Sequence, residues 1–425
     1  MSDLLRRAGG SGAPPRVLIV GGGVAALEAV LALRAHAGMR VEIELIAPRR
    51  ELSYPPLDVL EPFGLAPPQI DLADALASLG VRQRRDAVDD VDAREHWVHT
   101  AGGAVLHYEA LVLAIGARPA APFPGALVYG DPRSREDFAR LLAAADCGPR
   151  AGFVEQLLFV VPEGVSWPLP LYELAVMTAR RLAAAPGAGR SAPRIAIATT
   201  ERAPLELFGG RASGGLLEYL EQLGIAFLPG ARVEQVRPGE VHLEPGGRMR
   251  RADRVVTVPV LHGPRIEGLP HDADGFVPID AHGAVRGVSD VYAAGDATDF
   301  PIKQGGLATQ QADAIAETLA ARAGAPLTPA PFRPVLRGML LTSEQPRYLE
   351  SDVDGSGGAR ATETPLWWPP MKVAGRHLAP FLAERFCARM PAAPQPDERW
   401  LEGAIPCEIT LPVPEPAAGP AARAS

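Results

Sequence analysis

Residues 15–36 read PRVLIVGGGVAALEAVLALRAH, and this stretch decides the fold class. The apolar run from Pro15 to Val20 predicts a buried strand, and the glycine-rich turn after it opens directly into an amphipathic helix. A second apolar run, VEIELIA at 41–47, completes a strand–helix–strand unit. Such units join neighbouring parallel strands by a right-handed crossover, so the sequence predicts an α/β fold with a parallel sheet.

The turn between the first strand and the helix has the pattern G-x-G-x-x-A. Gly21 allows a tight turn, Gly23 lets a pyrophosphate approach the backbone, and Ala26 permits close packing of helix on sheet. Together with Gly22 these are the expected cofactor-binding residues of a dinucleotide site at the helix N-terminus. A glycine-rich turn with a purely structural role is the alternative.

The end of the second strand departs from the usual pattern of dinucleotide sites. A ribose-binding Asp or Glu is expected there, but the sequence has Ala47 followed by Pro48. Glu44 lies inside the strand and Glu51 lies beyond it. Ala47 therefore marks the expected ribose position without supplying a carboxylate.

The strand–helix–strand pattern starts again near Gly152, with strands expected at 157–162 and 194–200 and a helix from 171 to 185. We therefore expect two Rossmann-like dinucleotide-binding domains, each of three layers, with the second inserted in the first, and a C-terminal extension. The expected segments are a flexible N-terminus at 1–14, a first domain at 15–150 and 285–335, a second domain at 151–284, a C-terminal region at 336–400 and a partly disordered tail at 401–425.

Composition excludes several classes of protein. The formal net charge of -8 argues against general nucleic-acid binding, which needs a clustered cationic surface. The three cysteines, Cys147, Cys387 and Cys407, are widely spaced and form no zinc motif, so we expect no metal site. We expect a reducing, cytoplasmic location for the same reason. No apolar run approaches the length of a membrane span. Lysine occurs only at 303 and 372, although arginine is abundant.

Two later motifs turn the first one into a family resemblance. HYEALVLAIGARP at 107–119 and VYAAGDATDF at 291–300 follow the first motif in the order typical of flavoproteins with two dinucleotide-binding domains. The chain resembles the FAD-dependent pyridine nucleotide-disulfide oxidoreductase superfamily. The resemblance implies a non-covalent FAD, with Ala114 and Gly116 close to it and Asp296, held by Gly295, bonding a hydroxyl of its ribityl chain.

The same resemblance places a helix N-terminus at the flavin. A helix beginning near Gly306 would direct its positive end at the isoalloxazine ring. Lys303, Gln304, Gly305 and Gly306 would then lie beside that ring, and Lys303 is also expected to take part in catalysis by polarising it.

The branch of the superfamily follows from a missing motif. No CxxxxC pair follows the first strands, so disulfide reduction is excluded. SYPPLDVLEPFG at 53–64 and PIKQGGLATQQA at 301–312 look more like sulfide:quinone oxidoreductases and type II NADH dehydrogenases, which reduce quinone at the flavin. In VSWPLPLYELA, Trp167 occupies the place of the redox cysteine of the sulfide enzymes, so sulfide oxidation by their mechanism is not expected.

The second strand–helix turn has only one glycine, Gly164, where a nicotinamide site needs several. Pro162 removes a backbone donor, Glu163 adds negative charge and Trp167 fills space, although Glu201 stands where a ribose carboxylate could serve. We expect electrons to pass from an unidentified small-molecule donor through FAD to a quinone-like small-molecule acceptor. An NAD(P)H dehydrogenase with an atypical loop, and a non-catalytic flavin protein that acts through a partner, stay open.

Two further features bear on catalysis and location. Glu173 matches a family glutamate near the flavin and quinone, where a carboxylate could carry protons, and is the second expected catalytic residue. Its alternative is a helix-start glutamate that favours the macrodipole. In the C-terminal segment 365–390, apolar and basic side chains alternate after Trp367 and Trp368. A helix there could lie on the cytoplasmic face of a membrane, pack over the flavin domain or form a homodimer interface, although Pro380 is expected to interrupt it.

Overall fold

The computed structural model describes residues 13–65, 67–144, 154–184, 193–342, 347–349, 361–362, 369, 371–386 and 409–410. The three cysteines, Trp367, Trp368 and nearly all of the segments 1–14 and 401–425 lie outside the described residues.

The first sheet has five parallel strands in the order β18-β7-β1-β2-β3. They are β1 (Arg16–Val20), β2 (Glu42–Ile46), β3 (Arg82–Arg84), β7 (Ala110–Leu113) and β18 (Val291–Ala293). Val17, Leu18 and Ile19 of β1 point alternately to the two faces of the sheet, and all have 0% exposure. Because both faces are covered, the strand is a continuous apolar run instead of an alternating one.

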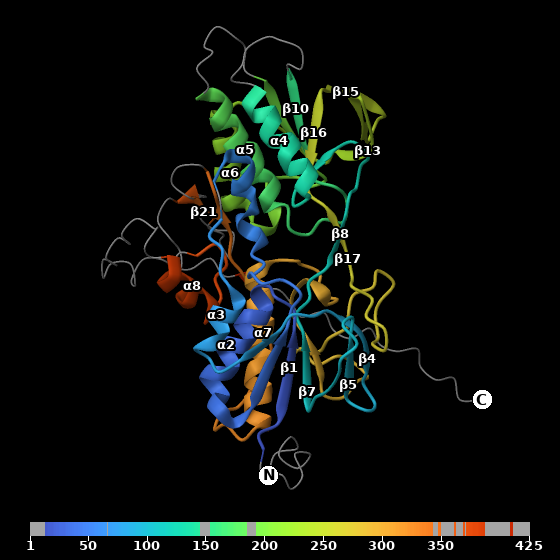
Figure 1. The fold of residues 1–425 in the computed structure, drawn as a ribbon. Helices are drawn as coiled ribbons and strands as arrows, with labels where there is room; N and C mark the ends of the chain where they lie inside the picture. The colour runs from blue at the N-terminus through green and yellow to red at the C-terminus, as the bar shows by residue number, and fades with distance from the viewer. Residues whose placement is uncertain are drawn as a thin grey trace, which may run out of the picture.

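Different layers cover the two faces of this sheet. The helices α2 (Val24–Ala37) and α7 (Gly305–Arg322) pack side by side on the face of Val17 and Ile19. A small antiparallel sheet of β4 (Val88–Asp92), β5 (Trp97–Thr100) and β6 (Val105–His107) packs on the opposite face (Figure 1). The result is the three-layer arrangement expected for a dinucleotide-binding domain.

The second sheet repeats this plan in the upper half of Figure 1. Its parallel strands, in the order β12-β11-β10-β16-β9, are β9 (Leu127–Val128), β10 (Gln156–Val160), β11 (Arg194–Ala198), β12 (Ile225–Leu228) and β16 (Arg254–Thr257). The helices α4 (Pro132–Ala144), α5 (Leu169–Ala183) and α6 (Gly210–Gln222) lie on one face. On the other face lies the antiparallel meander β13 (Arg232–Arg237), β14 (Gly239–Glu244) and β15 (Arg248–Ala252).

The second domain is inserted in the first, because β18 and α7 return to the first sheet after the second sheet is complete. Its bounds differ from the expected 151–284, because β9 and α4 already belong to it, whereas Ile266 and Val277 pack in the core of the first domain. Two crossing segments, β8 (Arg118–Ala120) and β17 (Val260–His262), pair antiparallel between the domains. The prolines at 119, 122 and 124 favour irregular structure, yet β8 forms here. A two-stranded ribbon has only edge strands, and an edge strand tolerates a residue such as Pro119 that has no N–H.

The remaining elements are short. They are η1 (Gly38–Arg40), η2 (Pro55–Phe63), α3 (Leu72–Ala77), η3 (Glu206–Phe208), η4 (Gly295–Ala297), β19 (Val335–Leu336), β20 (Met339–Leu340), β21 (Arg347–Leu349), β22 (Ala361–Thr362), α8 (Leu378–Phe386) and β23 (Ile409–Thr410).

The C-terminal helix α8 packs on the first domain. Val373, Leu378 and Leu382 belong to the core that α2 and α7 form, and each is at most 1% exposed. Pro380 does not interrupt the helix as expected, because it lies in the first turn of α8, where a helical N–H has no intrahelical partner in any case. The apolar side of this helix is therefore covered by the chain's own core.

Candidate functional site

The turn after β1 is shaped to let a ligand approach the backbone. Gly21 has a φ of 128°, and a Cβ built on it would lie 2.1 Å from the backbone oxygen of Ala114. Only glycine fits this position. A Cβ on Gly22 would lie 3.2 Å from Cβ of Ala47, whereas one on Gly23 would find its nearest neighbour at 3.8 Å. The backbone is thus crowded at Gly21 and Gly22, whereas the space beside Gly23 is open.

The helix that follows presents uncapped donors. The N-cap of α2 is Gly23, which has no side chain to accept from the first-turn amides, and the first turn holds no acidic residue. Free N–H groups and the positive end of the helix macrodipole together favour an anion such as a pyrophosphate. Ala26 is 0% exposed beneath this turn and lets the helix approach the sheet.

The expected ribose position contains no free carboxylate. Ala47 is fully buried, and Glu44, also 0% exposed, is held by Arg16 and by Arg84, whose Nε lies 2.9 Å from Glu44 Oε1. Burial would raise the pKa of the Glu44 carboxyl, but its hydrogen bonds and ion pairs with both arginines lower it below the ordinary value. Glu44 is therefore a structural anchor between strands, and exposed Glu51 is the next acidic residue along the chain.

Asp296 lies at the same carboxyl edge, after β18. Gly295 before it has a φ of 78° and donates its N–H to Gln311 Oε1 at 2.7 Å, which fixes the turn. Within the described ranges no hydrogen bond satisfies the Asp296 carboxyl, whose pKa is raised by burial and lowered in part by the charge of Lys303. A half-buried acceptor without a donor is suited to a ligand hydroxyl.

Lys303 brings a cation to this carboxylate. Its Nζ donates to the backbone oxygen of Thr298 and lies 3.7 Å from the centre of the Phe276 ring, while its N–H donates to Ser166 Oγ at 3.2 Å. Burial lowers the pKa of Lys303 to about 8, although Asp296 opposes this shift. The amine can therefore gain or lose a proton near neutral pH.

The start of α7 is closed more tightly than the sequence indicates. The Gln304 side chain caps the helix, accepting from Leu307 N–H at 2.7 Å, and its Nε2 donates to the backbone oxygen of Arg337 at 3.1 Å. It thus holds the helix end instead of facing a ligand. A Cβ on Gly305 would lie 3.0 Å from Val373, so the C-terminal segment lies directly against this helix start. Gly306 packs against Gln304 itself.

Glu173 is the most deeply buried acidic group of the site. It is 0% exposed on α5, forms an ion pair through Oε1 with Lys372, and accepts from Leu341 N–H at 2.7 Å. Its other oxygen, Oε2, is buried and has no hydrogen-bond partner in the described part of the chain. Burial raises the pKa of Glu173 although Lys372 opposes the shift, and burial lowers the pKa of Lys372. One proton can therefore be shared between the two groups.

Sequence reasoning did not single out Lys372, which it grouped with the basic side chains of the C-terminal segment 365–390. The structure corrects this, because the side chain is 7% exposed and its Nζ also donates to the backbone oxygen of Met339. One signal was available: Lys303 and Lys372 are the only lysines in the chain, and partial or full burial at this junction lowers the pKa of both. A chain that otherwise uses arginine retains lysine where a compact charge with an adjustable pKa is needed.

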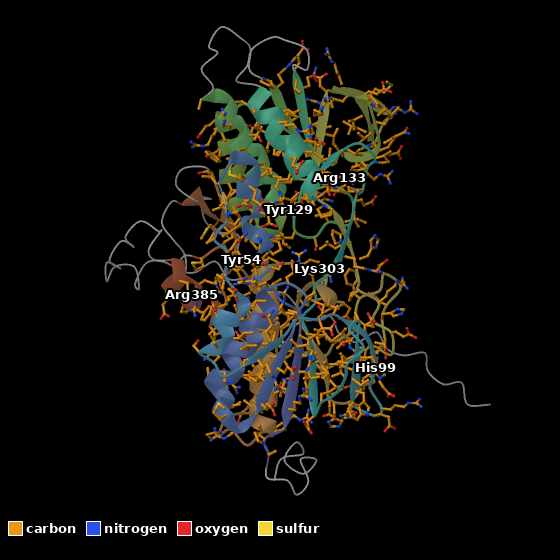
Figure 2. All side chains as sticks on the ribbon, viewed as in Figure 1. Tyr54, His99, Tyr129, Arg133, Lys303 and Arg385 are labelled. Atoms are coloured by element: carbon orange, nitrogen blue, oxygen red, sulfur yellow. The ribbon has the colours of Figure 1, made fainter. Side chains whose placement is uncertain are left out.

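Tyr54 joins the same junction from η2's N-cap. Its hydroxyl oxygen accepts from Val373 N–H at 3.1 Å, and burial raises its pKa. Figure 2 shows Tyr54, Tyr129 and Lys303 near the meeting point of the two domains, whereas His99 lies far from it. Tyr54 and Lys303, which lie far apart in the sequence, are thus both located where the domains meet.

The corresponding turn of the second domain is built differently. The N-cap of α5 is Pro168, and Pro170 lies in its first turn, so two backbone donors are absent. Trp167 packs against Phe208 at 5.7 Å between ring centres, and Phe208 is 1% exposed. Of the expected loop residues, Gly164 alone has a positive φ, at 83°. This turn does not form the open, donor-rich cradle of the first domain.

Glu201, the candidate ribose carboxylate of this domain, has internal partners. Its Oε2 accepts from the Tyr172 hydroxyl at 2.6 Å and from Thr199 Oγ1 at 3.0 Å. Burial raises the pKa of Glu201, and these hydrogen bonds oppose that rise. A ribose would have to compete for the carboxylate with Tyr172 and Thr199.

The predicted residues therefore fall into two groups. The carboxyl edge of the first sheet brings together Gly21, Gly22, Gly23, Ala47, Ala114, Gly116, Gly295 and Asp296, and the domain junction brings Lys303, Gly305 and Gly306 beside the C-terminal segment that holds Glu173. No helix in the described ranges combines the length and apolar character that crossing a bilayer requires.

Comparisons with known proteins agree with this geometry. None of the curated protein sequences matches the chain. Among solved structures, the sulfide:quinone oxidoreductase from the hyperthermophilic bacterium Aquifex aeolicus is 19% identical, with a TM-score of 0.68 over 79% of this chain and 83% of that one. A ferredoxin reductase from Rhodopseudomonas palustris is 17% identical, with a TM-score of 0.59 over 80% and 83%. NDH2 from Plasmodium falciparum, in complex with NADH, is 15% identical, with a TM-score of 0.54 over 67% and 64%.

These likenesses confirm the predicted α/β fold with two Rossmann-like domains. The family is shown by a separate match, since the model of the pyridine nucleotide-disulphide oxidoreductases covers residues 15–149 and 173–316, which is more than half of the chain. The resemblance inferred from the three sequence motifs is thereby confirmed. The chain belongs to the pyridine nucleotide-disulphide oxidoreductase family.

Proposed function

We propose that the protein is an FAD-dependent oxidoreductase that passes electrons from a donor other than a conventionally bound NAD(P)H to a quinone-like acceptor. One observation carries the proposal. The strands β1, β7 and β18 end side by side, so that Gly21, Ala114 and Ala294 are neighbours at one sheet edge. This edge combines an uncapped helix start with the unsatisfied carboxyl of Asp296.

The residues present fit an FAD. The backbone N–H groups at Gly23 and the start of α2 would hold its pyrophosphate, and the Asp296 carboxylate would accept from a ribityl hydroxyl. Lys303 would place a positive charge beside the cofactor. When bound, FAD supplies the electron chemistry, because it can accept two electrons from one partner and release them to another.

The Glu173–Lys372 pair supports a proton-handling role. Reducing a quinone to a quinol consumes two protons as well as two electrons, so a buried site needs a group that delivers protons. Glu173 holds a carboxylate oxygen, Oε2, free of hydrogen bonds, and Lys372 can exchange a proton with its other oxygen. The expected catalytic role of Glu173 is thus retained as part of the proposal. The Aquifex relative, whose name includes quinone, supports the same acceptor class.

The second domain supports a donor other than a nicotinamide bound in the usual turn. Pro168 and Pro170 remove donors from the helix start, and Glu201 is engaged by Tyr172. Trp167 stands at the position that resembles the redox cysteine of sulfide enzymes, and an indole cannot form a persulfide. The donor is therefore proposed to reach the flavin by another route.

The test is an anaerobic titration of the FAD-loaded protein, following the visible flavin absorbance. We expect neither NADH nor NADPH to bleach the band on a catalytic timescale, although dithionite does. The dithionite-reduced protein should then be reoxidised rapidly by a soluble ubiquinone analogue. Rapid bleaching by NADH would instead show a dehydrogenase with an atypical loop, and slow reoxidation by every quinone tested would favour a non-catalytic flavin protein.

A matched variant separates proton delivery from electron transfer. Glu173→Gln keeps the shape of the side chain but cannot ionise, so it should slow reoxidation by quinone and change its pH profile. Reoxidation by ferricyanide, which takes up electrons without protons, should be unaffected. Equal slowing with both oxidants would show that Glu173 has only a structural role.

A further inference from the structure

A second cluster of ligand-type side chains lies outside the redox site. It joins Glu28 of α2, Asp313 of α7 and His377, the residue just before α8. The carboxylate oxygens and the imidazole nitrogen that these residues offer all lie within 4.8 Å of one another. Three elements that are distant in the sequence therefore converge on one small volume.

Glu28 is held in place by the backbone of the C-terminal segment. It is 0% exposed, and its Oε1 and Oε2 accept from the N–H groups of His377 and Leu378 at 2.8 Å and 2.6 Å. These bonds cap the start of α8 and bring the imidazole of His377 to the carboxylate. Each carboxylate oxygen can accept more than one bond, so both keep a lone pair for a further partner.

The other two members have atoms without partners. Asp313 Oδ1 and His377 Nε2 lie 4.0 Å apart, are shielded from solvent and have no hydrogen bond in the described part of the chain. Nε2 of His36 is also buried without a hydrogen bond in the described part of the chain. The His36 ring packs edge-on against the His377 ring, with 5.5 Å between the ring centres. Unsatisfied buried polar atoms are uncommon in folded proteins, and two of these three belong to Asp313 and His377, whose ligand atoms lie within 4.8 Å of a Glu28 carboxylate oxygen.

Charge also requires a partner at this place. Glu28 and Asp313 are two carboxyl groups within hydrogen-bonding reach of one another, so either a shared proton or a cation must lie between them. The nearest guanidinium, that of Arg376, is 62% exposed and lies 3.4 Å from Glu317 instead. A cation placed among the three ligand atoms would compensate both carboxylates.

We propose that Glu28, Asp313 and His377 bind one divalent zinc ion, which fastens α8 to α2 and α7. A mixed imidazole and carboxylate set favours zinc over magnesium or calcium, which prefer oxygen ligands alone. In a tetrahedral site with zinc bonds of about 2.1 Å, ligand atoms lie about 3.4 Å apart, so Asp313 Oδ1 and His377 Nε2, which are 4.0 Å apart, must approach by about 0.6 Å when zinc binds. Water would complete a tetrahedral site.

The ion would act on the redox site through the chain. His377 follows Lys372 and Val373 by only a few residues, and these two contact Glu173 and Gly305. Fixing His377 to the first domain therefore also fixes the segment that places Lys372 against Glu173. This inference does not depend on the identity of the electron donor or acceptor.

The test is zinc binding by the full-length, FAD-loaded protein after treatment with EDTA. Titration with zinc chloride followed by desalting should leave one zinc per chain by mass spectrometry and raise the melting temperature, whereas magnesium should do neither. Asp313→Asn and His377→Gln should each weaken zinc binding by at least about tenfold. The control His271→Gln, which changes an exposed histidine, should bind zinc like the parent protein.

Two results would overturn the proposal. One is the absence of retained zinc at micromolar concentrations, and the other is retention that is equally strong in Asp313→Asn and His377→Gln, which would assign the ion to other ligands such as the cysteines. Retained flavin absorbance in each variant shows that the protein is folded. A loss of zinc affinity can thus be distinguished from a loss of structure.

Discussion

Lys372→Met should destabilise the protein strongly, because it removes the partner of a buried carboxylate. The Glu173 side chain is 0% exposed and that of Lys372 is 7% exposed. Water therefore cannot take the place of either side chain when that side chain is removed. Removing one member of a buried ion pair typically costs about 3–5 kcal/mol. The variant also leaves the backbone oxygen of Met339 without its donor.

The magnitude translates into a measurable melting shift. With an unfolding entropy of about 2.1 cal/mol/K per residue, a chain of 425 residues that unfolds cooperatively loses roughly 3–6 °C for that change in free energy. Differential scanning calorimetry of the FAD-loaded protein measures this shift. Arg140→Met is the matched control, since Arg140 pairs with Asp137 on the surface at 75% exposure and should cost about 0.5 kcal/mol or less.

A double-variant cycle tests the assigned cause. In Glu173→Gln/Lys372→Met neither group is charged, so the double variant should be more stable than the sum of the single effects predicts, by about 1–3 kcal/mol. Lys372→Met with a melting temperature within 1 °C of the parent protein would refute the reasoning. Strictly additive effects would show that the two side chains do not interact.

Three further predictions follow from the same geometry. Gly21→Ala places a Cβ 2.1 Å from a backbone oxygen and should abolish FAD retention, whereas Gly210→Ala, with no atom within 4 Å of its Cβ, should retain it; flavin absorbance after desalting decides. The pKa of Lys303 is about 8 in the folded, FAD-free protein and about 10.4 when unfolded, so folding releases a proton between these values, and stability should rise with pH from about 8 to 10.4. Urea unfolding across that range should show the rise in the parent protein and not in Lys303→Met. Tyr172→Phe removes the 2.6 Å donor to Glu201 and should cost about 1–3 kcal/mol, and an unchanged melting temperature would contradict that hydrogen bond.

The parts of the fold that depend on neighbouring residues could be predicted from the sequence. Local sequence determines three features, which are the apolar run from Arg16 to Val20, the tight turn at Gly21 and the helix from Val24. The helix is not amphipathic as expected, because its residues are buried without a break from Ala25 to Val30. Recurrence of the pattern after residue 152 gave the second domain and its insertion. Asp296 could be proposed because its turn has a strand-end motif of its own.

Features that depend on contacts between distant segments could not be predicted in this way. Strand β8 exists despite Pro119 because it finds β17 as a partner, and Gln304 caps α7 instead of facing a ligand because its amide also bonds Arg337. Lys372 looked like a surface cation because its immediate neighbours are those of an amphipathic helix. No local pattern shows that a carboxylate 199 residues away will be its partner.

By itself, the sequence determined the α/β class, the phosphate turn of the first domain and the family, since strand periodicity, glycine conformation and helix start are local properties of the chain. Only the tertiary structure decided which charged groups are buried together. Glu173 with Lys372, and Glu28 with Asp313 and His377, acquire their chemistry from the loss of water around them and from partners brought by other elements. Burial and partnership arise from packing, and packing depends on the whole chain.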